Sequence, residues 1–81
     1  MLALDQLVLV TTSDCHFCDH AHEVLDELGI DPLEIDVASA EAGELAQRGM
    51  PLAFLPVLTD GERVIGYGRL SARRLRKELA L

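Results

Sequence analysis

Aromatic and cysteine residues are scarce in this 81-residue sequence. It contains two phenylalanines, one tyrosine, no tryptophan and only two cysteines. The cysteines are separated by two residues, and so short a disulfide loop adds little stability, because loop-closure stabilisation grows with loop length. The sequence therefore argues against a secreted domain held together by disulfides, and the cysteines are better explained by chemistry than by fold stability.

Long hydrophobic runs are also missing. No stretch approaches the roughly 18–20 apolar residues of a membrane helix. The N-terminal segment lacks the basic residues of a secretory signal, and Asp5 interrupts its apolar stretch. We therefore expect no membrane partner and a cytoplasmic protein, in which a thiol pair stays reducible. With 49% hydrophobic and 26% charged residues, the chain is expected to form a single domain over residues 1–81.

Positive charge is nearly confined to the C-terminal part. The net charge is −7, and Arg48 is the only basic residue before Arg63. The basic residues that follow are Arg69, Arg73, Arg74, Arg76 and Lys77. We interpret this basic tail as a solvated helix face, with a site for an anionic partner as the alternative. Nucleic acid is not expected as a partner, because most of the surface would repel the phosphate backbone.

The two cysteines form a CxxC motif, Cys-His-Phe-Cys, at residues 15–18. The motif follows an apolar run at residues 7–10 and opens an amphipathic segment that ends near Gly29. Ser13 or Asp14 can cap this predicted helix. Cysteines at this spacing at a helix start come within disulfide reach, and the helix N-terminus favours a thiolate on the first. The arrangement is typical of a dithiol redox site.

The rest of the chain predicts an α/β fold with the order β-α-β-α-β-β-α. Parallel pairing of the first two strands, followed by a hairpin, gives a four-stranded mixed sheet with helices on both faces. The predicted elements after the first helix are a strand at 33–37, a helix at 39–48 capped by Ser39, a hairpin of strands 57–59 and 63–65 with a tight turn at Asp60-Gly61, and a helix at 71–79.

Two further features accompany the CxxC motif in a defined order. Pro56 stands at the start of the third strand, and the sequence Gly66-Tyr67-Gly68 precedes the last helix. With these features the chain resembles the glutaredoxin-like branch of the thioredoxin superfamily over nearly its whole length. The resemblance implies a thioredoxin-like fold, with Cys15 as the nucleophilic thiol and Cys18 as the resolving thiol. It also implies a cis Pro56 that forms a substrate-binding wall with Leu55.

Several positions depart from the usual glutaredoxin pattern. The lysine before the motif, the Pro-Tyr between the cysteines, the Thr-Val-Pro segment and the Gly-Gly followed by an acidic residue are replaced. Residues 12–14, 16–17, 54–56 and 66–69 stand in their places. Because the usual glutathione contacts are largely absent, we expect no cofactor, with bound glutathione as the alternative. We expect a monomer that exchanges disulfides with a protein or a low-molecular-weight thiol substrate, with a protein disulfide substrate or a thiol reductant as its partner. The CHFC motif is closer to that of a small family of glutaredoxin-like bacterial proteins.

The side chains around the motif modulate its chemistry. The helix terminus and a protonated His16 favour a thiolate on Cys15, whereas the carboxylates of Asp14 and Asp19 oppose it. We predict a Cys15 pKa below that of a free thiol. Phe17, Tyr67 and Phe54 are candidate substrate contacts, and Phe17 ranks first because the fold exposes the residues between the cysteines.

Two other classes of function are compatible with a CxxC motif. One is metal binding, since His16 and His20 share a helical face near the cysteines; a heavy-metal chaperone would, however, end in a strand, and this chain is predicted to end in a helix. We expect no dedicated metal site, and His22 points elsewhere on the helix. The other is a redox-inactive thioredoxin-like interaction module, against which only the retention of both cysteines argues.

Overall fold

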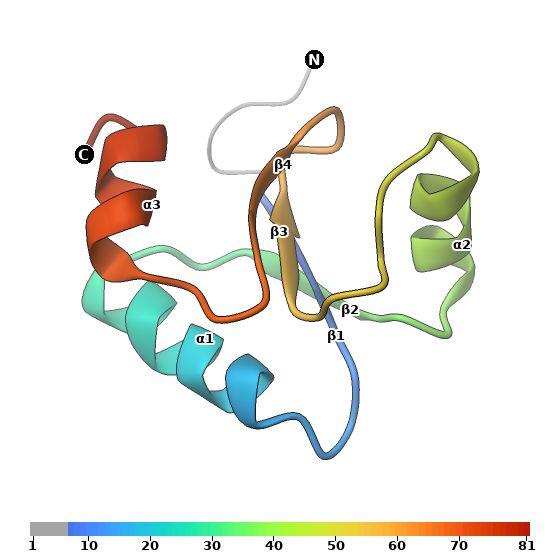
Figure 1. The fold of residues 1–81 in the computed structure, drawn as a ribbon, viewed down its shortest axis with the longest axis horizontal. Helices are drawn as coiled ribbons and strands as arrows, with labels where there is room; N and C mark the ends of the chain where they lie inside the picture. The colour runs from blue at the N-terminus through green and yellow to red at the C-terminus, as the bar shows by residue number, and fades with distance from the viewer. Residues whose placement is uncertain (1–6) are drawn as a thin grey trace.

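The computed structural model describes residues 7–81 and consists of a four-stranded sheet and three helices (Figure 1). The elements in chain order are β1 (Val8–Thr11), α1 (His16–Glu27), β2 (Leu33–Asp36), α2 (Ala40–Gln47), β3 (Val57–Thr59), β4 (Val64–Tyr67) and α3 (Ala72–Glu78). The predicted thioredoxin-like order of elements is confirmed. The N-terminal segment that was compared with a secretory signal, residues 1–6, lies outside the described residues.

The sheet is mixed, as predicted, and its strands are ordered β2-β1-β3-β4. β1 pairs with β2 in parallel and with β3 in antiparallel orientation, and β3 pairs with β4 in antiparallel orientation. The central position of β1 explains its continuous apolar sequence, since a strand covered on both faces needs apolar side chains on both. The edge strand β2 is largely exposed: Ile35 is partly buried, whereas Leu33 is 65% exposed although it is apolar.

Successive residues of the central strands enter different cores. Leu9 of β1 and Leu58 of β3 pack in a cluster with apolar residues of α1 and α3, whereas Val10 and Val57 pack with residues of α2. Side chains alternate between the two faces of a strand, so α1 and α3 cover one face of the sheet and α2 covers the other (Figure 1). The aliphatic side chains of the two central strands therefore contribute to the cores on both faces of the sheet.

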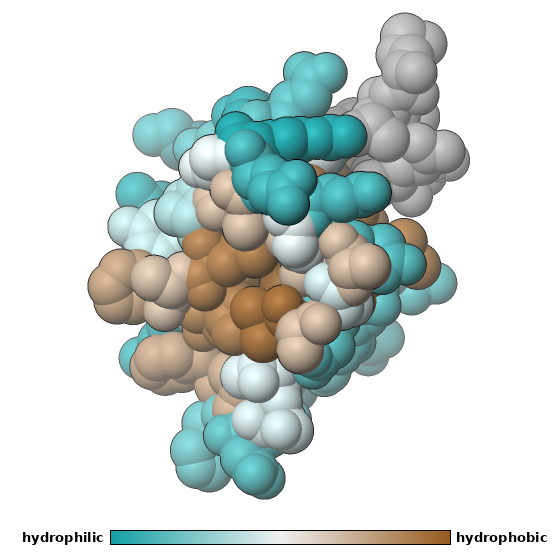
Figure 2. All heavy atoms as spheres, turned by 90° about the vertical axis from the view of Figure 1, so that its right-hand side faces the viewer, coloured by the Kyte–Doolittle hydropathy of each residue, from teal (hydrophilic) through white to brown (hydrophobic). Residues whose placement is uncertain are grey.

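The α2 layer leaves part of its sheet face uncovered. α2 has eight residues, of which only Ala42 and Leu45 are buried. Figure 2 shows a hydrophobic patch on this side of the molecule. The apolar residues that pack against this core but are only partly buried are Val8, Ile35, Val37, Leu52, Leu55 and Val64.

The connection between β3 and β4 is a loop, residues 60–63, that is longer than the predicted tight turn. The buried Thr59 Oγ1 donates to the Arg63 carbonyl at 2.6 Å and accepts from the Gly61 N–H at 3.0 Å. Asp60 Oδ1 accepts from the N–H groups of Arg63 and Glu62, and these hydrogen bonds hold the pKa of Asp60 below its usual value. Side-chain hydrogen bonds to the backbone thus close the loop in place of a two-residue turn.

Candidate functional site

Cys15 is itself the N-cap of α1. Its backbone is extended (φ −118°, ψ 108°), and its Sγ accepts a hydrogen bond from the Cys18 N–H at 3.0 Å. The prediction that Ser13 or Asp14 caps the helix is wrong, because the sulfur occupies the place where a serine or aspartate oxygen usually accepts. A backbone donor aimed at a sulfur stabilises its anionic form. The first turn of α1 thus places a backbone donor at Cys15 Sγ.

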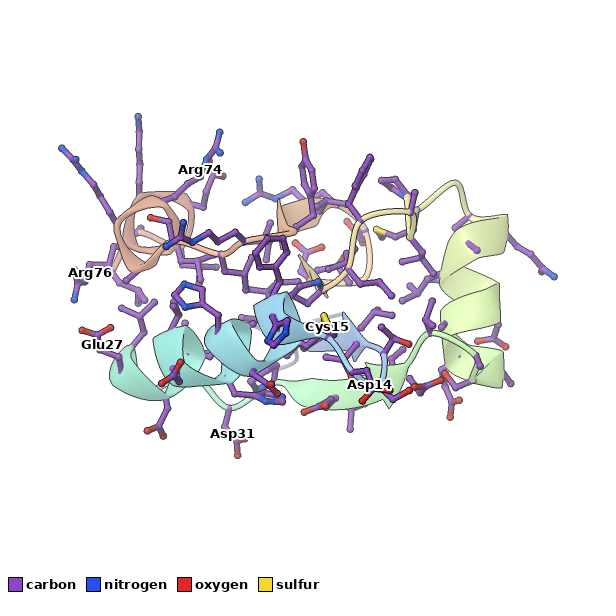
Figure 3. All side chains as sticks on the ribbon, turned by 60° about the horizontal axis from the view of Figure 1, so that its bottom comes forward. Asp14, Cys15, Glu27, Asp31, Arg74 and Arg76 are labelled. Carbon is purple, nitrogen blue, oxygen red and sulfur yellow. A yellow bond between two sulfur atoms is a disulfide. The ribbon has the colours of Figure 1, made fainter. Side chains whose placement is uncertain are left out.

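Cys15 and Cys18 form a disulfide, with Cα atoms 5.1 Å apart. Cys15 is partly exposed, whereas Cys18 lies one turn into the helix and is only 3% exposed. Figure 3 shows Cys15 at the tip of α1, beside the turn that carries Asp14. Asp14 has a left-handed backbone (φ 54°), a conformation that aspartate tolerates better than most residues. This turn brings the chain from the end of β1 directly into the motif.

Pro56 lies at the same end of the sheet as the CxxC motif. Val10 of β1 is paired with Val57 of β3 in antiparallel register, so the residue before Val57 stands next to the end of β1, where the motif follows. The Leu55–Pro56 peptide bond is cis, as the resemblance implied, and Pro56 is buried. The Pro56 carbonyl accepts from the Gly68 N–H at 2.8 Å. This hydrogen bond ties the segment after β4 to the start of β3.

All three aromatic residues of the chain are largely exposed. Phe17 is 50% exposed, Tyr67 61% and Phe54 68%. Tyr67 is paired in register with Val57, which brings it to the Pro56 end of the hairpin, and its ring centroid is 6.3 Å from that of Phe54. Tyr67 and Phe54 thus stand together near Pro56, and Phe17 stands on the first turn of α1. The Phe54–Tyr67 pair depends on strand register, for which the sequence contains no local signal.

The histidines of α1 serve different contacts. His20 Nε2 lies 3.1 Å from the Leu70 carbonyl oxygen, and His22 Nε2 lies 2.7 Å from Glu34 Oε1. The second carboxylate oxygen of Glu34 accepts from the hydroxyl of Thr11 at 3.0 Å. His16 is exposed on the turn next to Cys15. Within residues 7–81, no three histidine, cysteine or acidic side chains gather in a group that could hold a metal ion. The last element of the described chain is the helix α3.

None of the helices in the described part of the chain is both long and apolar enough to span a membrane.

Comparison with known proteins bears on the same elements. The family model for glutaredoxin matches residues 7–64, which is more than half of the chain. The matched segment contains both cysteines and Pro56 and stops before Gly66, Tyr67 and α3. No curated protein matches the chain. A CxxC pair with bonded sulfurs within this match supports a role of the thiol–disulfide oxidoreductase type. This chain therefore belongs to the glutaredoxin family.

Proposed function

We propose that this protein reduces disulfide bonds of polypeptides by thiol–disulfide exchange. The Cys15 thiolate attacks one sulfur of the substrate disulfide, forms a mixed disulfide and releases the other substrate sulfur, which takes up a proton. Cys18, after loss of its proton, then attacks Cys15 Sγ and releases the second substrate thiol. Two electrons pass to the substrate, and the Cys15–Cys18 disulfide is left on the protein.

The observation that carries this proposal is the unequal placement of the two sulfurs. Cys15 is partly exposed and its Sγ accepts a backbone N–H, whereas Cys18 is 3% exposed. A substrate disulfide can reach only the outer sulfur, and the inner one is placed to attack the mixed disulfide from within. His16 and Asp14 stand on either side of Cys15 and modulate its thiolate, Asp14 by its negative charge and His16 by its positive charge whenever it is protonated.

A polypeptide is the substrate that the surroundings of the motif support best. The usual glutathione contacts are largely replaced, and exposed aromatic rings stand at the same end of the sheet as the motif. In the proposed complex, Pro56 and Leu55 form the wall along which the substrate backbone lies, and Phe17 and Tyr67 contact its side chains. Aromatic rings supply large contact areas at low entropic cost, as in many protein interfaces.

The proposal also covers the setting of the reaction. The oxidised protein needs a thiol reductant to regenerate its dithiol, and a cytoplasmic location would supply one. The 81 residues act as one domain and as a monomer, without a resident cofactor or a dedicated metal site. Neither nucleic acid nor a membrane takes part.

Trapping of the mixed disulfide tests the proposed function. The variant Cys18→Ser cannot resolve, so a synthetic peptide disulfide should remain bound to Cys15 and be visible by mass spectrometry under non-reducing conditions. Cys15→Ser is the matched control and should trap nothing. Equal trapping by both variants would contradict the assigned roles. No trapping by Cys18→Ser, combined with stoichiometric binding of Cu(I) or Zn(II) by the wild type, would replace exchange by metal binding.

A further inference from the structure

A hollow of about 430 Å³ lies between the edge strand β4 and helix α3. Its volume is in the range of pockets that bind ligands. The side chains of Tyr67, Arg69, Ser71 and Arg74 line it, together with Glu78 at its far end. The hollow does not include the cysteines, and it is separate from the helix start that holds them.

The hollow is positively charged. Glu78, the only acidic residue in its lining, lies 3.7 Å from Arg63. Within residues 7–81, Arg69 and Arg74 have no carboxylate within 4 Å. Acidic residues are nevertheless plentiful, since the chain carries 14 of them and only seven basic residues. Figure 3 shows Arg74 extending from the side of α3 that faces away from α1. Two guanidinium groups are thus left for an external anion.

The charge of the remaining surface restricts where an acidic partner can bind. The net charge is −7, and Arg48 is the only basic residue before Arg63. Charges farther away than about 8 Å are largely screened at physiological ionic strength. An acidic segment in the hollow is therefore attracted by the two arginines and is only weakly repelled by the more distant acidic residues. Apart from the exposed basic residues of α3 outside the hollow, Arg73, Arg76 and Lys77, the rest of the chain is mostly acidic and would repel the same segment.

Tyr67 connects the hollow to the dithiol site. It lines the hollow, its ring stands beside that of Phe54, and it is paired with Val57, the neighbour of Pro56. The four residues of β4 along the hollow span roughly 13 Å at about 3.3 Å each, so a substrate with a disulfide at Cys15 can place residues a few positions away between β4 and α3.

We infer that this hollow is a docking site for an acidic segment of the polypeptide whose disulfide is exchanged at Cys15. The inference rests on the proposed function and adds a specificity to it: substrates with glutamate or aspartate residues a few positions from the cysteine are reduced faster. Arg69 and Arg74 bind the carboxylates, and Tyr67 packs on the apolar part of the segment nearer the disulfide.

Two synthetic peptides test the inference. Both carry one cysteine as a mixed disulfide with 2-mercaptoethanol, and four residues beyond a short spacer are glutamate in one peptide and glutamine in the other. We expect the reduced protein to react roughly two- to thirty-fold faster with the glutamate peptide at low salt, the effect of two exposed ion pairs. The preference should shrink at high salt.

Matched variants assign the preference to the hollow. Arg69→Gln/Arg74→Gln should bring the ratio of the two rates close to one. Arg73→Gln/Lys77→Gln removes the same charge from exposed positions of α3 outside the hollow and should keep most of the ratio. A ratio near one in the wild type, or an equal loss in both double variants, would overturn the inference. Reduction of the glutamine peptide separately tests the proposed exchange function.

Binding without chemistry provides an independent readout. A fluorescent glutamate peptide that lacks cysteine should bind the oxidised protein, measured by anisotropy, and should lose affinity in Arg69→Gln/Arg74→Gln but not in Arg73→Gln/Lys77→Gln. The absence of such binding would overturn the docking site even if exchange occurs. Tighter binding of an oligonucleotide with the same arginine dependence would reassign the hollow to nucleic acid. Self-association that requires the same two arginines would reassign it to a second copy of the chain.

Discussion

We predict that the carboxylate of Asp14 opposes a thiolate on Cys15, so that its removal should make Cys15 more reactive. Asp14 directly precedes Cys15 and is exposed in the turn between β1 and α1 (Figure 3). Its left-handed backbone (φ 54°) restricts the choice of replacement. Asparagine tolerates this conformation nearly as well as aspartate, so Asp14→Asn removes the charge and keeps the turn.

Coulomb's law gives the size of the effect. Side chains of adjacent residues in such a turn are about 7 Å apart, and an effective dielectric constant of about 50 is suitable for a partly exposed pair, which gives about 1 kcal/mol. This free energy corresponds to roughly five-fold more thiolate at a pH below the midpoint of the titration. Asp14→Asn should therefore shift the midpoint for Cys15 downward and raise its alkylation rate about five-fold in that range.

The assay is the pH dependence of alkylation by iodoacetamide in a Cys18→Ser background, in which Cys15 is the only thiol. Asp26→Asn is the matched control: it removes the same charge from α1, 11 residues after Cys15, which corresponds to about 16 Å at 1.5 Å per residue. At that distance salt screens most of the interaction. Equal shifts in both variants would refute the local electrostatic reasoning. A wild-type midpoint at or above about 8.5, the value of a free thiol, would refute the stabilised thiolate itself.

Three predictions concern the frame that positions the site. Thr59→Val should cost about 2–3 kcal/mol in urea unfolding, because the Arg63 carbonyl and the Gly61 N–H lose their partner, whereas Thr59→Ser should cost only about 1 kcal/mol. Equal costs would contradict this. Asp60→Asn should lower the urea midpoint at pH 7: the pKa of Asp60 is lowered in the folded state, so its contribution is present above the unfolded pKa and is lost as the pH falls through the folded one. The difference from the wild type should therefore begin to shrink below about pH 4 and vanish only at still lower pH, and a difference independent of pH would contradict the cause. Leu58→Ala, at a fully buried position, should cost about 2–5 kcal/mol, and a cost below 1 kcal/mol would contradict its place in the core.

Local sequence signals predicted the elements and the dithiol well. The apolar run of β1, the stop of α1 near Gly29 and the cap by Ser39 each depend on neighbouring residues, and the structure contains all of them. The helix cap at Cys15 was missed because serine and aspartate were available just before it. Asp14 has a left-handed backbone, so the helix begins after it and Cys15 becomes the N-cap. A glycine at this position would have indicated such a conformation, but the sequence has aspartate there.

Contacts that depend on strand register could not be predicted. The hydrogen bond from the Gly68 N–H to the Pro56 carbonyl and the pair of Phe54 with Tyr67 join segments that meet only when β3 and β4 are aligned, and a β-bulge shifts that alignment after Leu58. The hollow beside Arg69 needs the position of α3 as well. The sequence offered a site for an anionic partner only as the alternative interpretation of the basic tail, and only the tertiary structure places Arg69 and Arg74 at one hollow.

In the proposed function, the reacting thiol and the residues that would recognise a substrate lie on different elements of the fold. The buried apolar residues of the described chain are aliphatic apart from Cys18 and Met50, so the core is filled without aromatic rings. The aromatic rings are exposed instead, a placement that contributes little to folding and much to a contact. Under the proposed function, the thiolate depends on the start of α1, whereas selection of the substrate depends on the hairpin and α3. Changes at Asp14 should therefore alter reactivity toward every disulfide alike, and changes at Arg69 and Arg74 should alter only the choice among them.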